Sequence, residues 1–222
     1  MELSLAIHSD AGYHPNGKDI WGSLAICTTN FNNGQLASGV TRQASKKLAS
    51  ALLDNVTADL QKEYGRWAKR YLWDRNYSES RLPEVPSAIL ETVSHQSFPD
   101  MLMAQDPNFR FSLARSVYKT LLRYVCQMHG EKAVVAPLAP QGLRVEIVGK
   151  DQVRVSWRPQ VDKLEESAEP DAYILYTASG HTDFDNGEKV KGTSKKLKIA
   201  PGVQYNFRVT AVNKGGESFP SE

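Results

Sequence analysis

Residues 201–213 read Pro-Gly-Val-Gln-Tyr-Asn-Phe-Arg-Val-Thr-Ala-Val-Asn, and this stretch decides the fold of the C-terminal part of the chain. From Tyr205 to Ala211, apolar side chains alternate with polar ones, which predicts a strand with one buried face. Other short apolar runs precede it, at residues 143–147, 153–157, 172–176 and 197–199. Short strands at this spacing, separated by turn residues, indicate an antiparallel β-sandwich.

This part of the chain, about residues 138–222, resembles a fibronectin type III domain. The resemblance rests on Trp157 in the second strand, on Tyr173 and Tyr176 in the third, and on the stretch around Tyr205, which matches the family's tyrosine corner. It implies that Trp157 lies in the core and that the Tyr205 hydroxyl bonds to the backbone. We expect the final edge strand to be either very short or cut off. The sequence indicates no ligand for this domain.

The whole chain has 222 residues, a length that suits one or two domains. Two prolines among small residues at 131–140 predict an extended linker. We therefore expect an α/β domain at 1–130, the linker at 131–140 and the sandwich at 141–222. The 27 Lys and Arg nearly balance the 25 Asp and Glu, which gives no argument for a nucleic-acid partner. Apolar runs are too short for membrane insertion, and two cysteines are too few for a disulfide scaffold.

The N-terminal part alternates between strand and helix patterns. Apolar runs at 3–7, 22–27 and 86–90 predict strands, and residues 42–63 and 107–128 fit amphipathic helices. Such alternation predicts an α/β layered domain with a mixed sheet.

Two of the predicted strands end in polar residues, His8 and Glu91. In layered α/β folds, functional groups tend to lie at the carboxyl ends of strands. Neutral imidazole is a good zinc ligand, and a glutamate beside zinc can serve as a general base. A structural role is the alternative for a lone histidine at a strand end.

At these residues the chain resembles the zinc-dependent N-acetylmuramoyl-L-alanine amidases, which are bacterial peptidoglycan hydrolases. The likeness extends over about residues 3–128. Matching segments follow one another in the family's order, at 6–11 (Ala-Ile-His-Ser-Asp-Ala), 74–77, 82–92 (ending Ala-Ile-Leu-Glu-Thr), 94–100 and 106–110.

The resemblance implies an activity and the residues that carry it. His8 would be a zinc ligand, and Glu91 the general acid/base that takes a proton from water and passes it to the departing amine. The bond cleaved would join the lactyl group of N-acetylmuramic acid to the L-alanine of the stem peptide. The resemblance also implies an extracytoplasmic location, which means periplasmic, cell-surface or secreted.

The zinc site implied by the resemblance is incomplete in this sequence. The family uses three protein ligands, of which His8 matches the last, and the other two lie upstream of the matched segment. One imidazole does not hold a catalytic zinc ion. We therefore expect the chain to be a fragment that is inactive as it stands, with zinc bound only in the full-length parent.

Three further residues are candidates for substrate contact. Arg75 has the planar fork that suits a stem-peptide carboxylate, and His14 and His95 follow the two strands that end in His8 and Glu91. A structural or surface role is the alternative for each.

Two other functions stay open. The chain could be a non-catalytic protein that binds peptidoglycan or another cell-surface glycan. It could also belong to another secreted polysaccharide-active enzyme, such as a lyase, although the sequence does not place the Tyr/His or Arg pair that a lyase needs.

Overall fold

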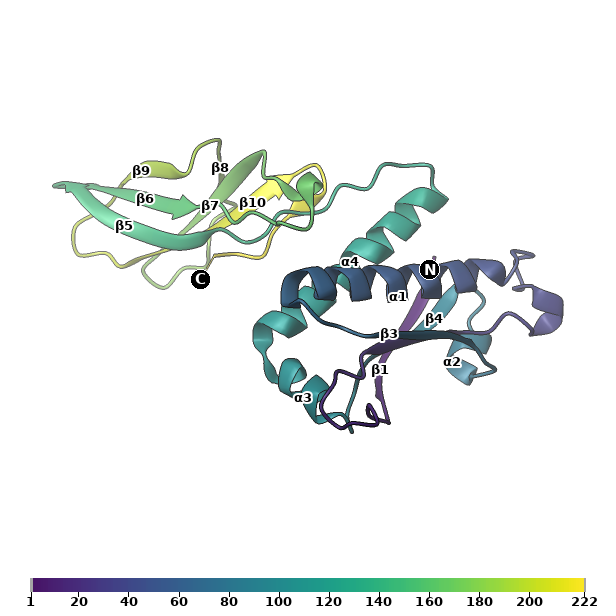
Figure 1. Ribbon diagram of the computed structural model, residues 1–222. Helices are drawn as coiled ribbons and strands as arrows, with labels where there is room; N and C mark the ends of the chain where they lie inside the picture. Colours follow the sequence, from purple (N-terminus) through teal and green to yellow (C-terminus); the bar gives the residue numbers. More distant parts are fainter. Residues whose placement is uncertain (1, 222) are drawn as a thin grey trace. The chain divides into compact units, whose positions relative to one another are not determined.

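The computed structural model describes residues 2–221, which divide into two compact units, one up to Lys132 and one from Ala133 (Figure 1). The first unit contains helices and a sheet, and the second is built from strands. This confirms the predicted fold class of an α/β domain followed by an all-β sandwich. In the part of the chain that the structure describes, no helix is both long and apolar enough to cross a membrane.

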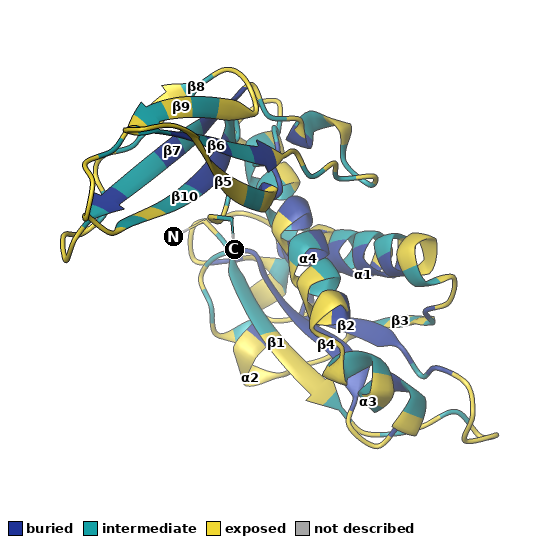
Figure 2. Cartoon of the chain, turned by 90° about the vertical axis from the view of Figure 1, so that its left-hand side faces the viewer, coloured by how far each residue is buried: buried dark blue, intermediate teal, exposed yellow. Residues whose placement is uncertain are grey.

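A four-stranded mixed sheet forms the centre of the first unit. Its strands, in spatial order, are β1 (Ser4–Asp10), β4 (Ser87–Ser94), β2 (Ser23–Cys27) and β3 (Lys69–Asp74). Strand β1 pairs with β4 in parallel, β4 with β2 antiparallel, and β2 with β3 in parallel. Figure 2 shows that β4 and β2, the two inner strands, are mostly buried, whereas much of the edge strand β1 is exposed.

Two long helices, α1 (Gln43–Tyr64) and α4 (Pro107–Met128), cover one face of this sheet (Figure 1). Helix α1 buries Leu48, Leu52, Val56 and Leu60 completely, because their four-residue spacing puts them on one side. The Asp106 carboxylate accepts a hydrogen bond from the Asn108 amide at 2.9 Å and caps α4. Both helices lie where the sequence predicts them.

The short helices were not predicted. They are α2 (Ser78–Arg81), α3 (Phe98–Gln105) and the 3-10 turn η1 (Asn32–Gly34). Helix α3 lacks an apolar buried stripe, since Phe98 and Leu102 are exposed and its buried residue is Asp100. Helix α2 lies on the sheet face opposite α1 and α4 (Figure 1). That face carries the small apolar cluster of Leu24, Ile26 and Ile89.

The buried carboxylate of Asp100 joins three segments of the first unit. It accepts hydrogen bonds from the amides of Trp21 (2.8 Å), Gly22 (3.0 Å) and Ser94 (3.0 Å), and from the Ser97 hydroxyl (2.9 Å). These bonds tie the residues before β2 and the end of β4 to the first turn of α3. A carboxylate with several donors is a strong junction, because charge-assisted hydrogen bonds are about twice as strong as neutral ones.

The second unit is an antiparallel sandwich of two sheets. One sheet contains β11 (Gly216–Glu217), β10 (Tyr205–Asn213), β7 (Ala172–Ser179) and β8 (Glu188–Val190). The other contains β5 (Gln141–Gly149), β6 (Gln152–Arg158) and β9 (Ser194–Lys198), and the 3-10 turn η2 (Glu166–Ala168) precedes β7.

The two anchor residues predicted for this sandwich are confirmed. Trp157 is 4% exposed and packs edge-on against Tyr173, with ring centroids 5.5 Å apart. The Tyr205 hydroxyl accepts a hydrogen bond from the Ala200 amide at 3.0 Å, which is the expected tyrosine corner. The last strand, β11, is only two residues long, and pairing with β10 continues through the Ser218 and Ser221 amides.

The segment expected to be a linker forms no helix or strand, and from Ala133 onward it belongs to the second unit. Val135 and Leu138 are buried. The Val135 amide donates to the Ser167 hydroxyl at 3.1 Å, and its carbonyl accepts from the Asn213 side chain at 2.9 Å.

We predict that Asp100→Asn lowers the free energy of unfolding of the first unit by about 3 kcal/mol, because at least one buried amide loses its acceptor and the remaining bonds lose their charge. Urea unfolding of the full chain, followed at the amide NMR signals of α1 and β4, measures this value. Asp106→Asn is the matched control, because asparagine caps a helix about as well as aspartate. A loss at Asp100 no larger than in the control would contradict the junction.

Candidate functional site

His8 and Glu91 lie side by side on neighbouring parallel strands. They are register partners in β1 and β4, and His8 Nδ1 is 3.8 Å from Glu91 Oε1. Leu24 of β2 is also in register with Glu91 and belongs to the apolar cluster opposite α1. Residues in register share a face, so His8 and Glu91 project from the face that the long helices leave uncovered.

The Glu91 carboxyl is buried in an environment that favours its protonated form. Its side chain is 11% exposed, and Oε2 is buried without a hydrogen-bond partner among the described residues. Burial raises the pKa of Glu91 above the ordinary value of 4.5, and the Asp10 carboxylate adds to this, while His8 and Arg70 oppose it. A raised pKa brings a carboxyl closer to the operating range of a general acid/base, which must both accept and donate a proton.

A second acidic side chain lies beside His8. Glu79 of α2 places Oε1 3.2 Å from His8 Nε2. The imidazole of His8 therefore lies between two carboxyl groups, Glu79 on one nitrogen and Glu91 on the other. The sequence reasoning missed Glu79, because α2 is a single turn with no periodic pattern.

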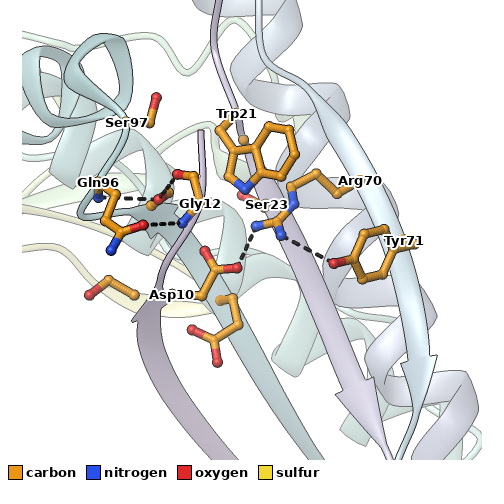
Figure 3. Close-up of polar contacts among 12 residues, drawn as sticks. Asp10, Gly12, Trp21, Ser23, Arg70, Tyr71, Gln96 and Ser97 are labelled. Carbon is orange, nitrogen blue, oxygen red and sulfur yellow. Dashed lines mark hydrogen bonds and ion pairs between the residues drawn. The ribbon is translucent and has the colours of Figure 1, made fainter. Parts of the chain in front are cut away.

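A buried ion pair lies next to Glu91. Arg70 of β3 donates from Nη1 to Asp10 Oδ2 at 2.6 Å, and the two side chains are 8% and 19% exposed. The guanidinium carbon of Arg70 also lies 4.6 Å from the centre of the Trp21 ring and 5.3 Å from that of Tyr71. Figure 3 shows Arg70 between these aromatic rings, with its fork directed at Asp10.

Several polar atoms of this region are buried without a hydrogen-bond partner among residues 2–221. They are Glu91 Oε2, Asp10 Oδ1, Arg70 Nε and Trp21 Nε1. Two are acceptors and two are donors. Since buried polar groups in proteins are nearly always hydrogen-bonded, a concentration of unpaired ones around Glu91 marks a candidate functional site.

Among the described residues, the other predicted site residues form no hydrogen bond or ion pair with Glu91. His14 stays within its own loop, where its Nδ1 accepts from the Asn16 amide at 3.5 Å and lies 3.8 Å from Asp19. His95 directly follows β4, and its amide donates to the Asp10 carbonyl at 3.0 Å. Arg75 directly follows β3, and its guanidinium lies 5.6 Å from the centre of the Trp73 ring.

Sequence reasoning also gave no role to Asp10 and Arg70. Asp10 stands two residues after His8 on the same strand, so its spacing carried a usable signal. Arg70 belongs to the run Lys-Arg-Tyr-Leu-Trp-Asp at 69–74, whose partial alternation is consistent with an edge strand. Its contact with Asp10 arises only from tertiary packing.

The residues present do not fit a zinc ion held by three protein ligands. Within residues 2–221, no three His, Cys, Asp or Glu side chains come together in a way that could hold a metal ion. Glu79 and Glu91 flank the His8 imidazole, but each is paired with a ring nitrogen, and the three side chains do not converge on a common point.

The second unit has clear relatives. Residues 138–222 match the family model of the fibronectin type III domain, and this part of the chain is such a domain. A stretch of 79 residues, 35% of the chain, is 37% identical to human neural cell adhesion molecule L1, of which it covers 6%. The structure of the twitchin kinase region from C. elegans is 26% identical over 39% of this chain and 15% of its own, with a TM-score of 0.35.

Two amidase structures are similar to a larger share of the chain. N-acetylmuramoyl-L-alanine amidase AmiC2 of Nostoc punctiforme is 15% identical over 55% of this chain and 57% of its own, with a TM-score of 0.42. N-acetylmuramoyl-L-alanine amidase from Clostridium difficile 630 is 15% identical over 56% of this chain and 57% of its own, with a TM-score of 0.43. Likeness at this level does not identify a function.

We predict that Glu91→Gln stabilises the chain increasingly as the pH rises above 4.5. A raised folded-state pKa means that the folded chain binds more protons than the unfolded chain above 4.5, so the wild type loses stability until the pH passes the folded-state pKa. The variant lacks this loss. Thermal unfolding of both proteins from pH 4 to pH 8 gives the difference.

The control for this measurement is Glu63→Gln, which removes a carboxylate from the exposed end of α1. A difference at Glu91 that is independent of pH, or one that the control reproduces, would contradict the raised pKa.

Proposed function

We propose that the first unit is a peptidoglycan-directed amide hydrolase domain in which Glu91 transfers protons. The observation that carries the proposal is the register pairing of His8 with Glu91, whose carboxyl is buried and has a raised pKa. The ordered motifs that resemble the zinc-dependent amidases give the substrate class. An extracytoplasmic location follows from that substrate, and the fibronectin type III domain supports it because related sandwich domains are common on cell surfaces.

Glu91 has the properties that amide hydrolysis requires of a general acid/base. The reaction removes a proton from the attacking water and delivers a proton to the departing amine. Ionised Glu91 would accept the first proton, and the protonated carboxyl would supply the second. The low exposure of Glu91 keeps bulk water from competing for that proton.

Asp10 and Arg70 would act on the reaction through Glu91. The Asp10 carboxylate raises the pKa of Glu91, and the Arg70 guanidinium opposes this. Because Arg70 is bound to Asp10 and stacked against aromatic rings, the charges around Glu91 are held in fixed positions. We propose that these two are positioning residues.

The need for zinc ligands determines which form of the protein is expected to cleave peptidoglycan. Residues 2–221 do not supply three protein ligands for zinc. We therefore propose that residues 2–221 alone have no zinc-dependent turnover and that activity requires ligands from outside them.

The test is muropeptide cleavage by the natural protein that carries this chain. Glu91→Gln is expected to lower kcat by about 100-fold or more, the contribution typical of a general acid/base. Glu63→Gln, at an exposed position on α1, should leave kcat unchanged. An active natural protein whose Glu91→Gln variant cleaves muropeptides at the wild-type rate would contradict the role of Glu91.

A second candidate is a domain that binds peptidoglycan without cleaving it. The lack of a three-ligand metal group among the described residues favours this function. Co-sedimentation of the natural protein with insoluble peptidoglycan, combined with the cleavage assay, separates the two. Binding without release of stem peptides, with zinc present, would favour the second function.

A further inference from the structure

Strand β3 exposes a pair of aromatic rings on the same sheet face as Glu91. Tyr71 is 39% exposed and Trp73 is 36% exposed, and their ring centroids are 4.8 Å apart. The guanidinium of Arg75 lies beside the Trp73 ring. We call Tyr71, Trp73 and Arg75 the aromatic strip.

The sheet register connects the aromatic strip to the proposed site. Glu91 pairs with Leu24. Ser23 pairs with Lys69 and Ala25 with Leu72, so the register shifts at Leu24, and Arg70 and Tyr71 together lie opposite it. One row across the sheet therefore runs from His8 through Glu91 and Leu24 to the irregular step in β3 that contains Tyr71. The next row runs through Ile89 and Ile26 to Trp73.

The distance between the two ends of this row suits a short extended ligand. Glu91 in β4 and Tyr71 in β3 are separated by strand β2 alone. Two strand spacings amount to about 10 Å. A ligand lying on the rings would have to extend about this far, past the buried Leu24, to bring an attached group to the Glu91 carboxyl.

The rings are held in place by the buried ion pair. Arg70 donates from Nη2 to the Tyr71 hydroxyl at 3.3 Å and from Nη1 to Asp10, and it lies against the Tyr71 ring (Figure 3). Tyr71 in turn packs on Trp73, and Trp73 on Arg75. This continuous set of contacts restricts the rings, so a ligand would lose little free energy in ordering them.

The chemistry of the aromatic strip favours a saccharide over a protein surface. A pyranose ring has a face of C–H groups that packs on an aromatic ring, and its rim of hydroxyl and amide groups accepts hydrogen bonds. Arg75 supplies charged donors at one end of the strip, and the Tyr71 hydroxyl a polar group at the other. A protein interface usually needs a much larger area than two half-exposed rings provide.

We propose that the aromatic strip binds a pyranose ring of a glycan strand and thereby directs the group attached to that ring toward Glu91. The inference rests on the proposed function for the substrate class, since it assigns the glycan part of peptidoglycan to β3. It adds Tyr71 and Trp73 as sugar-binding residues. It also gives Arg75 a place beside the sugar rather than beside Glu91.

The test is an NMR titration of the full chain with a short oligomer of N-acetylglucosamine. The Trp73 indole signal, assigned with Trp73→Phe, and the amide signals of β3 are expected to shift and to saturate. Tyr71→Ala and Trp73→Ala should each weaken the affinity by about tenfold, the upper range for loss of one aromatic contact. Phe98→Ala is the matched control, because Phe98 is an exposed aromatic residue on α3.

Each other outcome overturns the proposal. The first is the absence of oligomer-dependent shifts in β3, or shifts that Tyr71→Ala and Trp73→Ala leave unchanged. A second is a response of Trp73 to the dipeptide L-alanyl-D-isoglutamine but not to the saccharide. A third is a Trp73 signal that moves with protein concentration alone, which would identify a contact between copies of the chain. The amide spectra of the alanine variants must retain the dispersion of the folded chain. If they do not, Arg75→Ala replaces them, and it is expected to weaken binding of the oligomer. Tyr71→Phe and Trp73→Phe, which keep an aromatic ring, are then measured beside it.

The Glu91→Gln variant distinguishes this inference from the proposed function. It is expected to bind the oligomer with the affinity of the wild type, because Glu91 lies two strands away from Tyr71. Loss of cleavage with retained saccharide binding would support both proposals. Retained cleavage with retained saccharide binding would contradict the role of Glu91 and leave the aromatic strip intact.

Discussion

The buried Asp100 carboxylate is the constraint on which the geometry of the first unit depends. It binds the amides of Gly22 and Ser94, and so fixes the start of β2 against the end of β4. Glu91 lies three residues before Ser94, and Leu24, its register partner, lies two residues after Gly22. A shift of either strand would break charge-assisted hydrogen bonds in a buried environment, which is costly. The position of Glu91 therefore follows from a carboxylate that takes no part in the proposed chemistry.

The site itself is less well satisfied than the rest of the fold. In the part of the chain that the structure describes, Glu91, Asp10, Arg70 and Trp21 each have a buried polar atom without a hydrogen-bond partner, although Arg70 and Asp10 form a close ion pair. Natural proteins accept such local conflicts mainly where function requires them. The described part of the fibronectin type III domain has two such residues, Trp157 and Arg208, but the Tyr205 hydroxyl at its tyrosine corner is bonded to the backbone.

The sequence predicts much of this fold because its largest elements have regular patterns. Helices α1 and α4 repeat apolar residues about every four positions, and the alternation in β6 and β10 places Trp157 and Val209 in the sandwich core. Strand β3 and helix α3 have no comparable pattern. The first is a half-exposed edge strand, and the buried residue of the second is a carboxylate.

The site could be predicted only in part, for a related reason. His8 and Glu91 close apolar runs, so a reading of the chain finds them. Glu79 and Arg70 reach the same place through packing of α2 and β3, which local sequence does not encode. Arg75 illustrates the limit, because the sequence suggests a substrate contact for it but does not reveal that its guanidinium packs beside Trp73 of the edge strand β3.

The central claim is that the fold holds Glu91 as a buried, proton-transferring carboxyl. A titration of the Glu91 side-chain carboxyl carbon by NMR, in the full chain, measures this property directly. The midpoint is expected above the ordinary value of 4.5, because burial and the Asp10 carboxylate outweigh the opposing charges of His8 and Arg70. A midpoint at or below 4.5 would contradict the claim.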